Sequence, residues 1–215
     1  MLFRSSHVAA LLQGFARVVS EGKPELILVR GYSGIGKSSV VHELHKPVVQ
    51  RRGFFLSGKF DQLQRDVPYA TLAQAIRGLV QQLLVGTDEE VFQWREQLHE
   101  ALRGNGQVLV DLVPQLALLM GPQTAVPELP PAEAQHRFTQ VFLQFLGVFA
   151  TAEHPLVLFL DDLQWADLAS LRLLQFLLTE ESAPPVLWIG AYREDRKSTR
   201  LNSSHSGESR MPSSA

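Results

Sequence analysis

The sequence contains no cysteine. This absence excludes disulfide bonds, zinc sites with cysteine ligands and catalysis by a thiol, although it does not fix the cellular compartment. No run of apolar residues approaches the roughly 20 that a membrane-spanning helix needs. The N-terminal segment also lacks the apolar core and small-residue cleavage site of a secretory signal. We therefore expect a cytoplasmic protein.

An excess of positive charge is also missing. The 20 lysines and arginines face 22 aspartates and glutamates, which gives a formal net charge of −2. Domains that bind nucleic acids usually carry a basic face, so the composition gives no support for such a partner. Hydrophobic residues make up 45% of the 215 positions, which suits one globular domain or slightly more.

The last part of the chain differs sharply in composition from the rest. Residues 195–215 hold seven serines among 21 residues and almost no apolar side chains, which is typical of a disordered tail. Its first part, DRKSTRLNSSH, also matches the translation of a widely used sequencing adapter. We therefore expect one incomplete domain at 1–194, and a disordered, non-native tail at 195–215.

Short apolar runs alternate with longer segments of helical periodicity across residues 1–194. This alternation predicts an α/β domain around a mostly parallel sheet. Strands are expected at 25–30, 53–58, 154–162 and 185–192. Helices are expected at 38–49, within 66–84, and at 89–102, 107–119, 132–150 and 168–178.

Several local patterns refine the expected helices. Pro47 is expected to end or kink the helix at 38–49, and Pro114 to break the one at 107–119. Thr71 and Gln74 have the spacing of a capping box. An amphipathic N-terminal helix is expected to bury one apolar face, formed by Val8, Leu11, Leu12, Phe15 and Val18.

A glycine-rich segment follows the first expected strand. It reads GYSGIGKSS and satisfies the phosphate-loop pattern G-x-x-x-x-G-K-[ST]. Its glycines let backbone N–H groups turn toward a phosphate, its lysine reaches the β- and γ-phosphates, and its serine hydroxyl ligates Mg²⁺. The competing interpretation is a glycine-rich turn with an exposed lysine. The nucleotide-binding residues predicted are Gly31, Tyr32, Ser33, Gly34, Ile35, Gly36, Lys37, Ser38 and Ser39.

Two aspartates end the third expected strand. A phosphate-loop NTPase needs an acidic strand end that holds Mg²⁺, usually through water, and Asp161 lies where that residue is expected. Asp162 is the candidate catalytic acid that orients and polarises the attacking water. Glutamate is commoner at that position, so the shorter aspartate leaves the rate of hydrolysis open. The alternative role for Asp162 is to cap a helix or turn.

Other polar residues near the expected strand ends have weaker support. Arg193 follows the fourth strand and is predicted to sense the γ-phosphate, the alternative being a solvated arginine. Lys59 and Asp61 follow the second strand, where they would line the edge of the site. Asp167 is expected to cap the helix that starts at Leu168. A packing role is expected for Trp165. Three histidines, His42, His45 and His154, are expected to be structural or surface residues.

Three segments together resemble a known family. GYSGIGKSS, RRGFFLSGKFDQLQRDVPYATLAQA and FLDDLQWADLASL are similar to the AAA-type ATPase module of large bacterial signalling proteins, which join a serine/threonine kinase domain to GAF and histidine-kinase domains. That module belongs with Orc1-like AAA ATPases and the STAND group of signalling NTPases, and the resemblance covers about residues 8–194. It implies an ASCE-type P-loop NTPase fold of three layers, with a five-stranded sheet in the order 5-1-4-3-2. It also implies ATP as nucleotide, Mg²⁺ as cofactor and flanking signalling domains as partners.

The chain departs from that family in two places. Relatives open with a Gly-Arg-x-x-Glu segment near the adenine pocket, whereas this chain reads LFRSSHVAALL, so that only Arg4 has a counterpart. The sequence also stops before the fifth strand and the helical lid, and an incomplete sheet leaves an unpaired edge. The adenine contacts therefore stay open.

The leading hypothesis is a regulatory module that binds ATP and hydrolyses it slowly. Lys37, Asp162 and Arg193 would carry the catalysis, while Ser38 and Asp161 would hold the metal. One alternative is a switch that binds nucleotide with negligible turnover. Another is an origin-recognition-like DNA-binding ATPase, which the acidic balance and the lack of a visible helix-turn-helix disfavour. The long helical insert between the second and third strands disfavours a small-molecule kinase.

Overall fold

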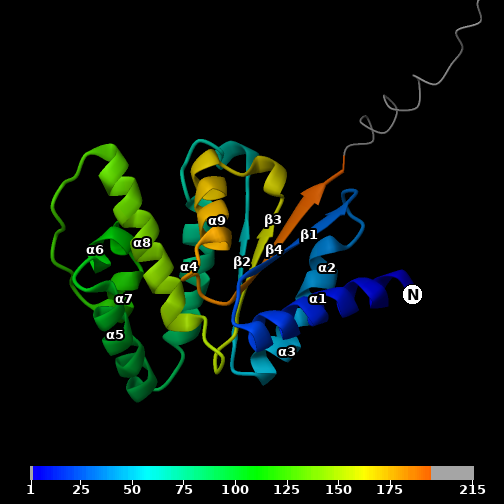
Figure 1. Cartoon of the computed structure of the whole chain (residues 1–215), viewed down its shortest axis with the longest axis horizontal. Coiled ribbons are helices and arrows are strands. Elements are labelled where there is room, and N and C mark those ends of the chain that lie inside the picture. Colours follow the sequence, from blue (N-terminus) through cyan, green and yellow to red (C-terminus); the bar gives the residue numbers. More distant parts are fainter. Residues whose placement is uncertain (1, 195–215) are drawn as a thin grey trace, which may run out of the picture.

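A parallel four-stranded sheet forms the centre of the molecule (Figure 1). The computed structural model describes residues 2–194, so the predicted tail lies outside the described part. The strands are β1 (Glu25–Gly31), β2 (Phe54–Lys59), β3 (Leu156–Asp161) and β4 (Val186–Arg193), in the order β1-β4-β3-β2. The α/β fold class predicted from the sequence is confirmed, and the strand order matches the last four places of the expected 5-1-4-3-2.

Helices cover both faces of the sheet (Figure 1). One face carries α1 (Leu2–Glu21), α2 (Lys37–Val41) and α3 (His45–Gln50). The opposite side carries α4 (Ala70–Leu83), α5 (Asp88–Leu102), α6 (Gly106–Leu112), α7 (Leu116–Met120), α8 (Pro131–Phe149) and α9 (Leu168–Thr179). In Figure 1, α5 to α8 form a group on the outer side of α4 and α9. No helix within residues 2–194 is long and apolar enough to span a bilayer.

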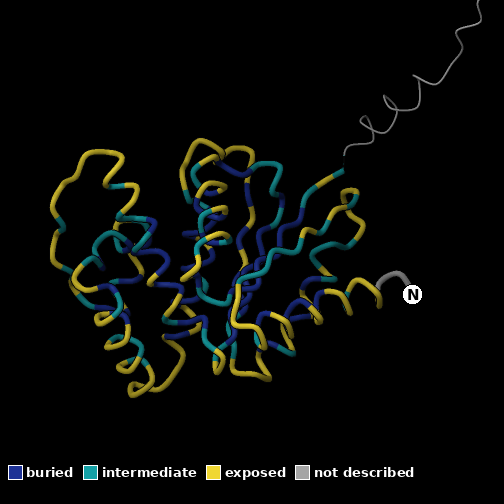
Figure 2. The backbone as a smooth tube through the Cα atoms, viewed as in Figure 1, coloured by how far each residue is buried: buried dark blue, intermediate teal, exposed yellow. Residues whose placement is uncertain are grey.

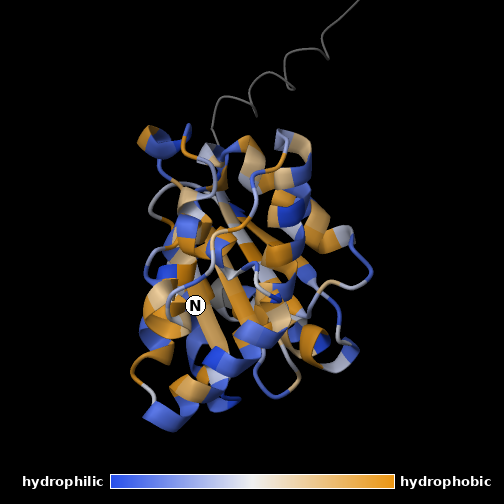
Figure 3. Cartoon of the chain, turned by 90° about the vertical axis from the view of Figure 1, so that its left-hand side faces the viewer, coloured by the Kyte–Doolittle hydropathy of each residue, from blue (hydrophilic) through white to orange (hydrophobic). Residues whose placement is uncertain are grey.

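Two hydrophobic cores lie on opposite faces of the sheet, because successive strand residues point in opposite directions. On β3, Val157 and Phe159 pack with α1 to α3, whereas Leu156, Leu158 and Leu160 pack with the helices of the other side. All five side chains are buried. Figure 2 shows this buried centre in dark blue, and Figure 3 shows that the strands are mostly hydrophobic and the outer turns mostly hydrophilic. The continuous apolar run that predicted β3 therefore reflects burial on both faces.

Helix α1 forms as predicted, with two corrections. Leu11, Phe15 and Val18 are buried against the sheet, whereas Val8 is only partly buried and Leu12 is 37% exposed. Val19 packs against the same core instead. Leu11, Phe15 and Val18 follow the i, i+4, i+7 spacing of one helical stripe, and Leu12 lies at its border.

The first strand is an edge of the sheet. Within residues 2–194, β1 pairs with β4 alone, and Leu28 in its middle is 55% exposed. The fifth strand that the resemblance implies has no counterpart among the described residues.

Pro47 changes the helical segment after the phosphate loop, but it does not end that segment early. The chain stays helical from Lys37 to Gln50, with a 3₁₀ turn at His42–Leu44 directly before α3. Proline lacks the N–H that would bond to the carbonyl of Glu43, and its ring crowds that carbonyl. The turn before Pro47 tightens as a consequence. The helix at 107–119 is broken near Pro114, between α6 and α7, as predicted.

The capping box predicted at Thr71 and Gln74 is wrong. Tyr69 is the N-cap of α4, in a left-handed conformation, and no side chain caps this end. The Thr71 hydroxyl donates instead to the carbonyl of Lys59 at 3.4 Å, and the Gln74 side-chain oxygen accepts from the N–H of Lys59 at 3.1 Å. These contacts fix α4 to the end of β2, and only glycine fits at position 58, where a Cβ would lie 2.5 Å from the Thr71 carbonyl oxygen.

A capping box that the sequence analysis missed lies at the start of α5. The N–H of Glu90 donates to the Thr87 hydroxyl at 3.3 Å, and the N–H of Thr87 donates to the Glu90 carboxylate at 2.8 Å. The signal was present in the sequence, since threonine is followed three residues later by glutamate.

Asp167 caps α9 as predicted, and the cap is expected to contribute measurably to stability. Its buried carboxylate accepts from the N–H of Ser170 at 2.8 Å and from the Ser170 hydroxyl at 2.6 Å. Asp167→Ala should lower the free energy of unfolding by about 1–2 kcal/mol, because it leaves buried donors of α9 without an acceptor. Urea unfolding followed by circular dichroism measures this change. Asp66→Ala, at an exposed position, is the control, and equal effects of the two substitutions would contradict the prediction.

Candidate functional site

The phosphate-loop segment connects β1 to α2 at the carboxyl edge of the sheet. Gly31 ends β1, and α2 begins at Lys37. Gly34 and Gly36 have φ angles of 77° and 94°, which residues other than glycine rarely adopt. The turn therefore has the backbone conformation that the glycine pattern predicts. Tyr32, Ser33, Ile35 and Ser39 complete the loop, all exposed.

Lys37 folds back over this loop. Its ammonium donates to the carbonyl of Gly31 at 3.0 Å and to the carbonyl of Tyr32 at 3.1 Å. The side chain is therefore held at the loop, and it is not the freely exposed lysine of the competing interpretation. An ammonium has three donor hydrogens, so one remains for a further acceptor.

Ser38 and Asp161 are brought together across 123 positions of sequence. The Ser38 hydroxyl donates to a carboxylate oxygen of Asp161 at 2.8 Å. Asp161 ends β3, while Ser38 lies in the first turn of α2, and both side chains are partly buried. The parallel sheet explains this meeting, because its strands all end at the same edge. Two hard oxygen donors from distant segments thus converge on one point.

Asp162 is buried and held by several groups at once. The residue is only 6% exposed, and its backbone is in a left-handed conformation with a φ of 55°. Arg193 donates from Nε to one carboxylate oxygen at 3.0 Å and from Nη2 to the other at 3.2 Å. Gln164 donates at 2.9 Å, and the Lys59 ammonium lies 3.5 Å away. The side chain makes no capping hydrogen bond, so the alternative role for Asp162 is not observed.

These partners keep Asp162 ionised. Burial alone raises the pKa of its carboxyl, but the hydrogen bonds from Arg193 and Gln164 and the charges of Arg193 and Lys59 outweigh burial, and the pKa lies below its usual value. The carboxylate is thus charged at neutral pH. It is also a weaker proton acceptor while Arg193 holds it, because the ion pair stabilises the charged form.

The sheet register explains why these side chains meet. Lys59 pairs with Asp161 in the ladder between β2 and β3, and Gly31 pairs with Arg193 in the ladder between β1 and β4. Arg193 is therefore at the carboxyl edge, as predicted. Its guanidinium binds Asp162, and its side chain is 44% exposed. The N–H of Arg193 also donates to Gln164 at 3.1 Å.

Two cavities flank this edge. One, of about 410 Å³, is lined by the phosphate loop and by residues of β1, α1 and α2, among them His7, Ile35 and Lys37. The other, of about 580 Å³, is lined by the ends of β2, β3 and β4 and by α4, and it includes Lys59 and Asp162. Arg4, the predicted counterpart of an adenine-site arginine, lies in α1, but its side chain is not among those that the structure describes.

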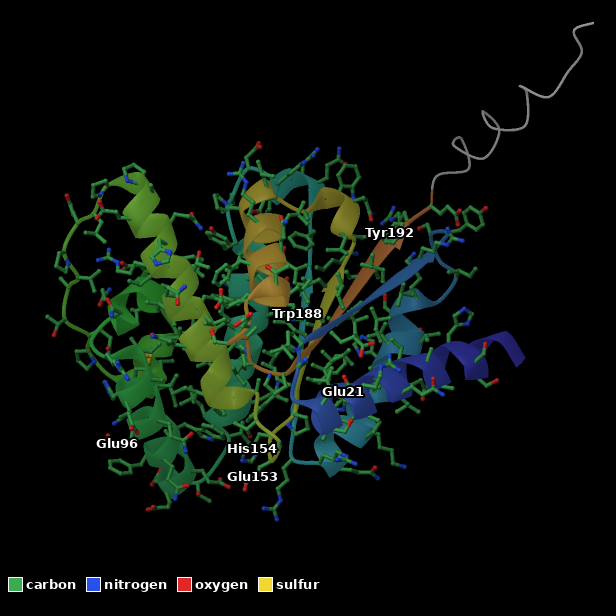
Figure 4. All side chains as sticks on the ribbon, in the orientation of Figure 1. Glu21, Glu96, Glu153, His154, Trp188 and Tyr192 are labelled. Atoms are coloured by element: carbon green, nitrogen blue, oxygen red, sulfur yellow. The ribbon has the colours of Figure 1, made fainter. Side chains whose placement is uncertain are left out.

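The remaining predicted residues have the following places. Trp165 is half-buried and packs against the core, as predicted, and it also lines the 580 Å³ cavity together with Asp61. His42 lies against the rings of Phe55 and Phe159, and His154 against Phe54 and Trp94. His45 also contacts Phe55. Figure 4 shows His154 at the opposite end of the sheet from Tyr192, which lies next to Arg193 in sequence.

Sequence reasoning missed two residues near the site. Gln164 bridges Asp162 and the backbone of Arg193, and its position two residues after Asp162 was the only available signal. Arg77 lines the larger cavity from α4. In the sequence, a charged residue on an amphipathic helix indicated only a surface position.

Comparison with known proteins agrees with this geometry. A profile of the AAA ATPase domain matches residues 1–189, nearly all of the described chain. The chain belongs to this AAA ATPase domain family. It is 37% identical over 175 residues to "Hybrid signal transduction histidine kinase G" of Dictyostelium discoideum, and 25% identical over 193 residues to "Histidine protein kinase 1" of Candida albicans. Each alignment covers 81% of this chain, but only 5% and 8% of those proteins.

Two side chains at the carboxyl edge could serve as metal ligands. Within residues 2–194, no group of three or more histidines, aspartates and glutamates is placed to hold an ion. The pair of Ser38 and Asp161 supplies one hydroxyl and one carboxylate. Such a sparse set of hard oxygens fits Mg²⁺, which takes its other ligands from water and from substrate phosphates.

Proposed function

We propose that this AAA ATPase domain binds ATP with Mg²⁺ and hydrolyses it slowly, as a regulatory module of a larger signalling protein. The observation that carries the proposal is the 2.8 Å hydrogen bond between Ser38 and Asp161. It joins the end of the phosphate loop to the acidic end of β3, the two parts that phosphate-loop ATPases use to hold the metal. Family membership supports ATP as the nucleotide.

The phosphate loop would bind the β- and γ-phosphates. The positive φ angles of Gly34 and Gly36 direct backbone N–H groups of the turn to one side. Lys37 would exchange the carbonyls of Gly31 and Tyr32 for phosphate oxygens, which are stronger acceptors because they are charged. The 410 Å³ cavity beside the loop, with His7 on its wall, is the proposed place of the base.

The metal would lie between Ser38 and Asp161. Bound there, Mg²⁺ would neutralise charge on the phosphate oxygens. The Ser38 hydroxyl would turn a lone pair toward the cation and give up its bond to Asp161. Asp161 would hold the cation directly or through water.

Asp162 would position the attacking water and accept its proton. That water attacks the γ-phosphorus, the bond to the bridging oxygen of ADP breaks, and phosphate leaves. In the observed arrangement Arg193 occupies both carboxylate oxygens of Asp162. We infer that Arg193 turns toward the γ-phosphate when ATP binds, which frees Asp162 and raises the pKa of its carboxyl toward the ordinary value. Slow turnover follows, because a strong ion pair must first break.

This same ion pair supports a second candidate function. A domain in which Arg193 keeps Asp162 occupied would bind nucleotide with negligible turnover and act as a switch between two states. Steady-state phosphate release separates the two candidates. No observation favours DNA binding, and the formal charge of −2 still disfavours it.

The regulatory role rests on the relatives. Both are named as histidine kinases, and the chain spans 5% and 8% of their lengths. By analogy, the partners would be flanking kinase and sensor domains of one long protein, whose packing would depend on whether ATP or ADP is bound. The narrower placement among bacterial, Orc1-like or STAND proteins stays a prediction.

Ser38→Ala is expected to remove most of the gain in ATP affinity that Mg²⁺ provides. The substitution deletes a metal ligand but leaves the phosphate loop and Lys37 intact. Calorimetric titration of ATP with and without Mg²⁺ should show about a tenfold loss in the presence of the metal and little change without it. Ser20→Ala, in the exposed part of α1, is the control. An unchanged response to Mg²⁺ would place the metal elsewhere.

A further inference from the structure

The 580 Å³ cavity next to Asp162 is distinct from the phosphate loop. Its lining comes from the end of β2, the segment that follows it, α4, and the ends of β3 and β4. None of the phosphate-loop residues 31–39 lines it. Asp162 and Arg193, however, belong to both the proposed hydrolysis site and this cavity. The ion pair between Asp162 and Arg193 therefore lies between the proposed hydrolysis site and the cavity.

Three cations face this cavity. Arg77 projects from α4 and is half-buried, and it makes no hydrogen bond or ion pair with any residue between 2 and 194. The Lys59 ammonium has one long contact, 3.5 Å from Asp162, and its side chain is 64% exposed. Arg193 completes the set. Because Arg77 lines the cavity and has no anionic partner among the described residues, it is the strongest indication of a ligand.

The two carboxylates that line the cavity are already engaged. Asp61 accepts the N–H of Leu63 at 2.9 Å and caps the short 3₁₀ helix at Gln62–Gln64. Asp162 is shared between Arg193 and Gln164. The unused hydrogen-bonding capacity of the wall therefore belongs mainly to donors on Lys59 and Arg77. Donor-only cations of this kind match an oxyanion with several acceptor oxygens.

We infer that this cavity binds the inorganic phosphate released by hydrolysis, with Arg77 and Lys59 as its ligands. The inference rests on the proposed function and adds a product site to it. In an in-line displacement the phosphoryl group moves away from ADP and toward the attacking water. In the proposed function Asp162 positions this water, and Asp162 also lines the cavity. Phosphate thus forms at the cavity wall, while ADP still covers the phosphate loop.

A phosphate in this cavity also affects the next cycle. It competes with Asp162 for Lys59 and Arg193, both within 3.5 Å of that carboxylate. Product phosphate should therefore change turnover without displacing ATP. Lys59 and Arg193 would thus contact both Asp162 during hydrolysis and the product phosphate before its release.

Equilibrium dialysis of radiolabelled orthophosphate against the full, nucleotide-free chain tests this inference. Lys37→Ala should retain saturable phosphate binding, because the cavity contains no phosphate-loop residue. Arg77→Gln should bind it about tenfold more weakly, and Arg77→Lys should recover part of the loss. Arg172→Gln is the matched control, since Arg172 is an exposed arginine of α9 outside the cavity. Circular dichroism verifies that each variant is folded.

The possible results separate this inference from the proposed function. Phosphate binding that survives Lys37→Ala and weakens in Arg77→Gln, with ATP affinity unchanged in Arg77→Gln, supports the product site. Phosphate binding that disappears in Lys37→Ala but persists in Arg77→Gln would put the ion on the phosphate loop and overturn the inference. Absence of saturable binding at millimolar phosphate would overturn it as well. Failure of the wild type to bind ATP refutes the proposed function, whatever the phosphate result.

Discussion

Asp162→Asn is expected to lower ATP turnover at least about 100-fold while it leaves ATP affinity within about threefold of wild type. Asparagine has nearly the shape of aspartate, and its single oxygen can still accept from Arg193 Nε and from Gln164, although the bond from Arg193 Nη2 is lost. It cannot take the proton of the attacking water, however. Phosphate release under steady-state conditions measures the turnover, and calorimetric titration measures the affinity.

Two further variants give this result its meaning. Asp162→Glu keeps a carboxylate and should retain measurable turnover, because glutamate can also accept the proton. Asp66→Asn, in the exposed segment before α4, should behave as wild type. Equal turnover in wild type and Asp162→Asn would show that another group activates the water. A wild-type chain that binds ATP but releases no phosphate would support the binding-only switch.

Lys37→Ala is expected to weaken ATP binding by about 100-fold, which corresponds to about 2.7 kcal/mol. The substitution removes the cation that reaches the phosphates, and it also removes the hydrogen bonds to the carbonyls of Gly31 and Tyr32. Lys46→Ala is the matched control, because Lys46 is an exposed lysine on the neighbouring helix α3.

The affinity for AMP distinguishes loss of a phosphate contact from loss of fold. AMP lacks the β- and γ-phosphates, so its weaker binding should change little in Lys37→Ala. A uniform loss for ATP and AMP, together with a lower unfolding temperature, would mean that the variant disrupts the loop. Unchanged ATP affinity in Lys37→Ala would contradict the phosphate-loop assignment.

The strands could be predicted because their signals are local, whereas the order of the sheet was implied only by the resemblance to the AAA-type ATPase module. Apolar runs ending in Gly31 and in Asp161 indicate buried strands, and the rule that parallel strands end at one edge brings these positions together. The pairing of Ser38 with Asp161 follows from the same two steps. The hydrogen bonds from Lys37 to the carbonyls of Gly31 and Tyr32 could not be predicted in this way, because they depend on the path of the loop backbone.

Contacts between elements were harder to predict. Thr71 and Gln74 have the spacing of a cap, yet their side chains bind the backbone of Lys59, since α4 lies close to β2 at Gly58. No pattern within α4 records that neighbour. For the same reason Arg77 reads as an ordinary surface residue in the sequence, and only the folded chain shows that it faces the cavity beside Asp162.

The pairing of Asp162 with Arg193 could be predicted only in part. The sequence places both residues at strand ends on the same edge, so their proximity could be predicted. Their direct ion pair could not, because it depends on the left-handed backbone of Asp162 and on the bridge from Gln164. This pair is why slow hydrolysis and nucleotide-dependent switching are both consistent with the same site.

The most direct test of the central claim is the affinity of the full chain for ATP, measured by calorimetry with and without Mg²⁺. The proposed site predicts binding of one ATP per chain in the micromolar range, tighter in the presence of Mg²⁺, since Ser38 and Asp161 would then share the cation with the phosphates. A chain that is folded by circular dichroism and binds no ATP under either condition would contradict the claim.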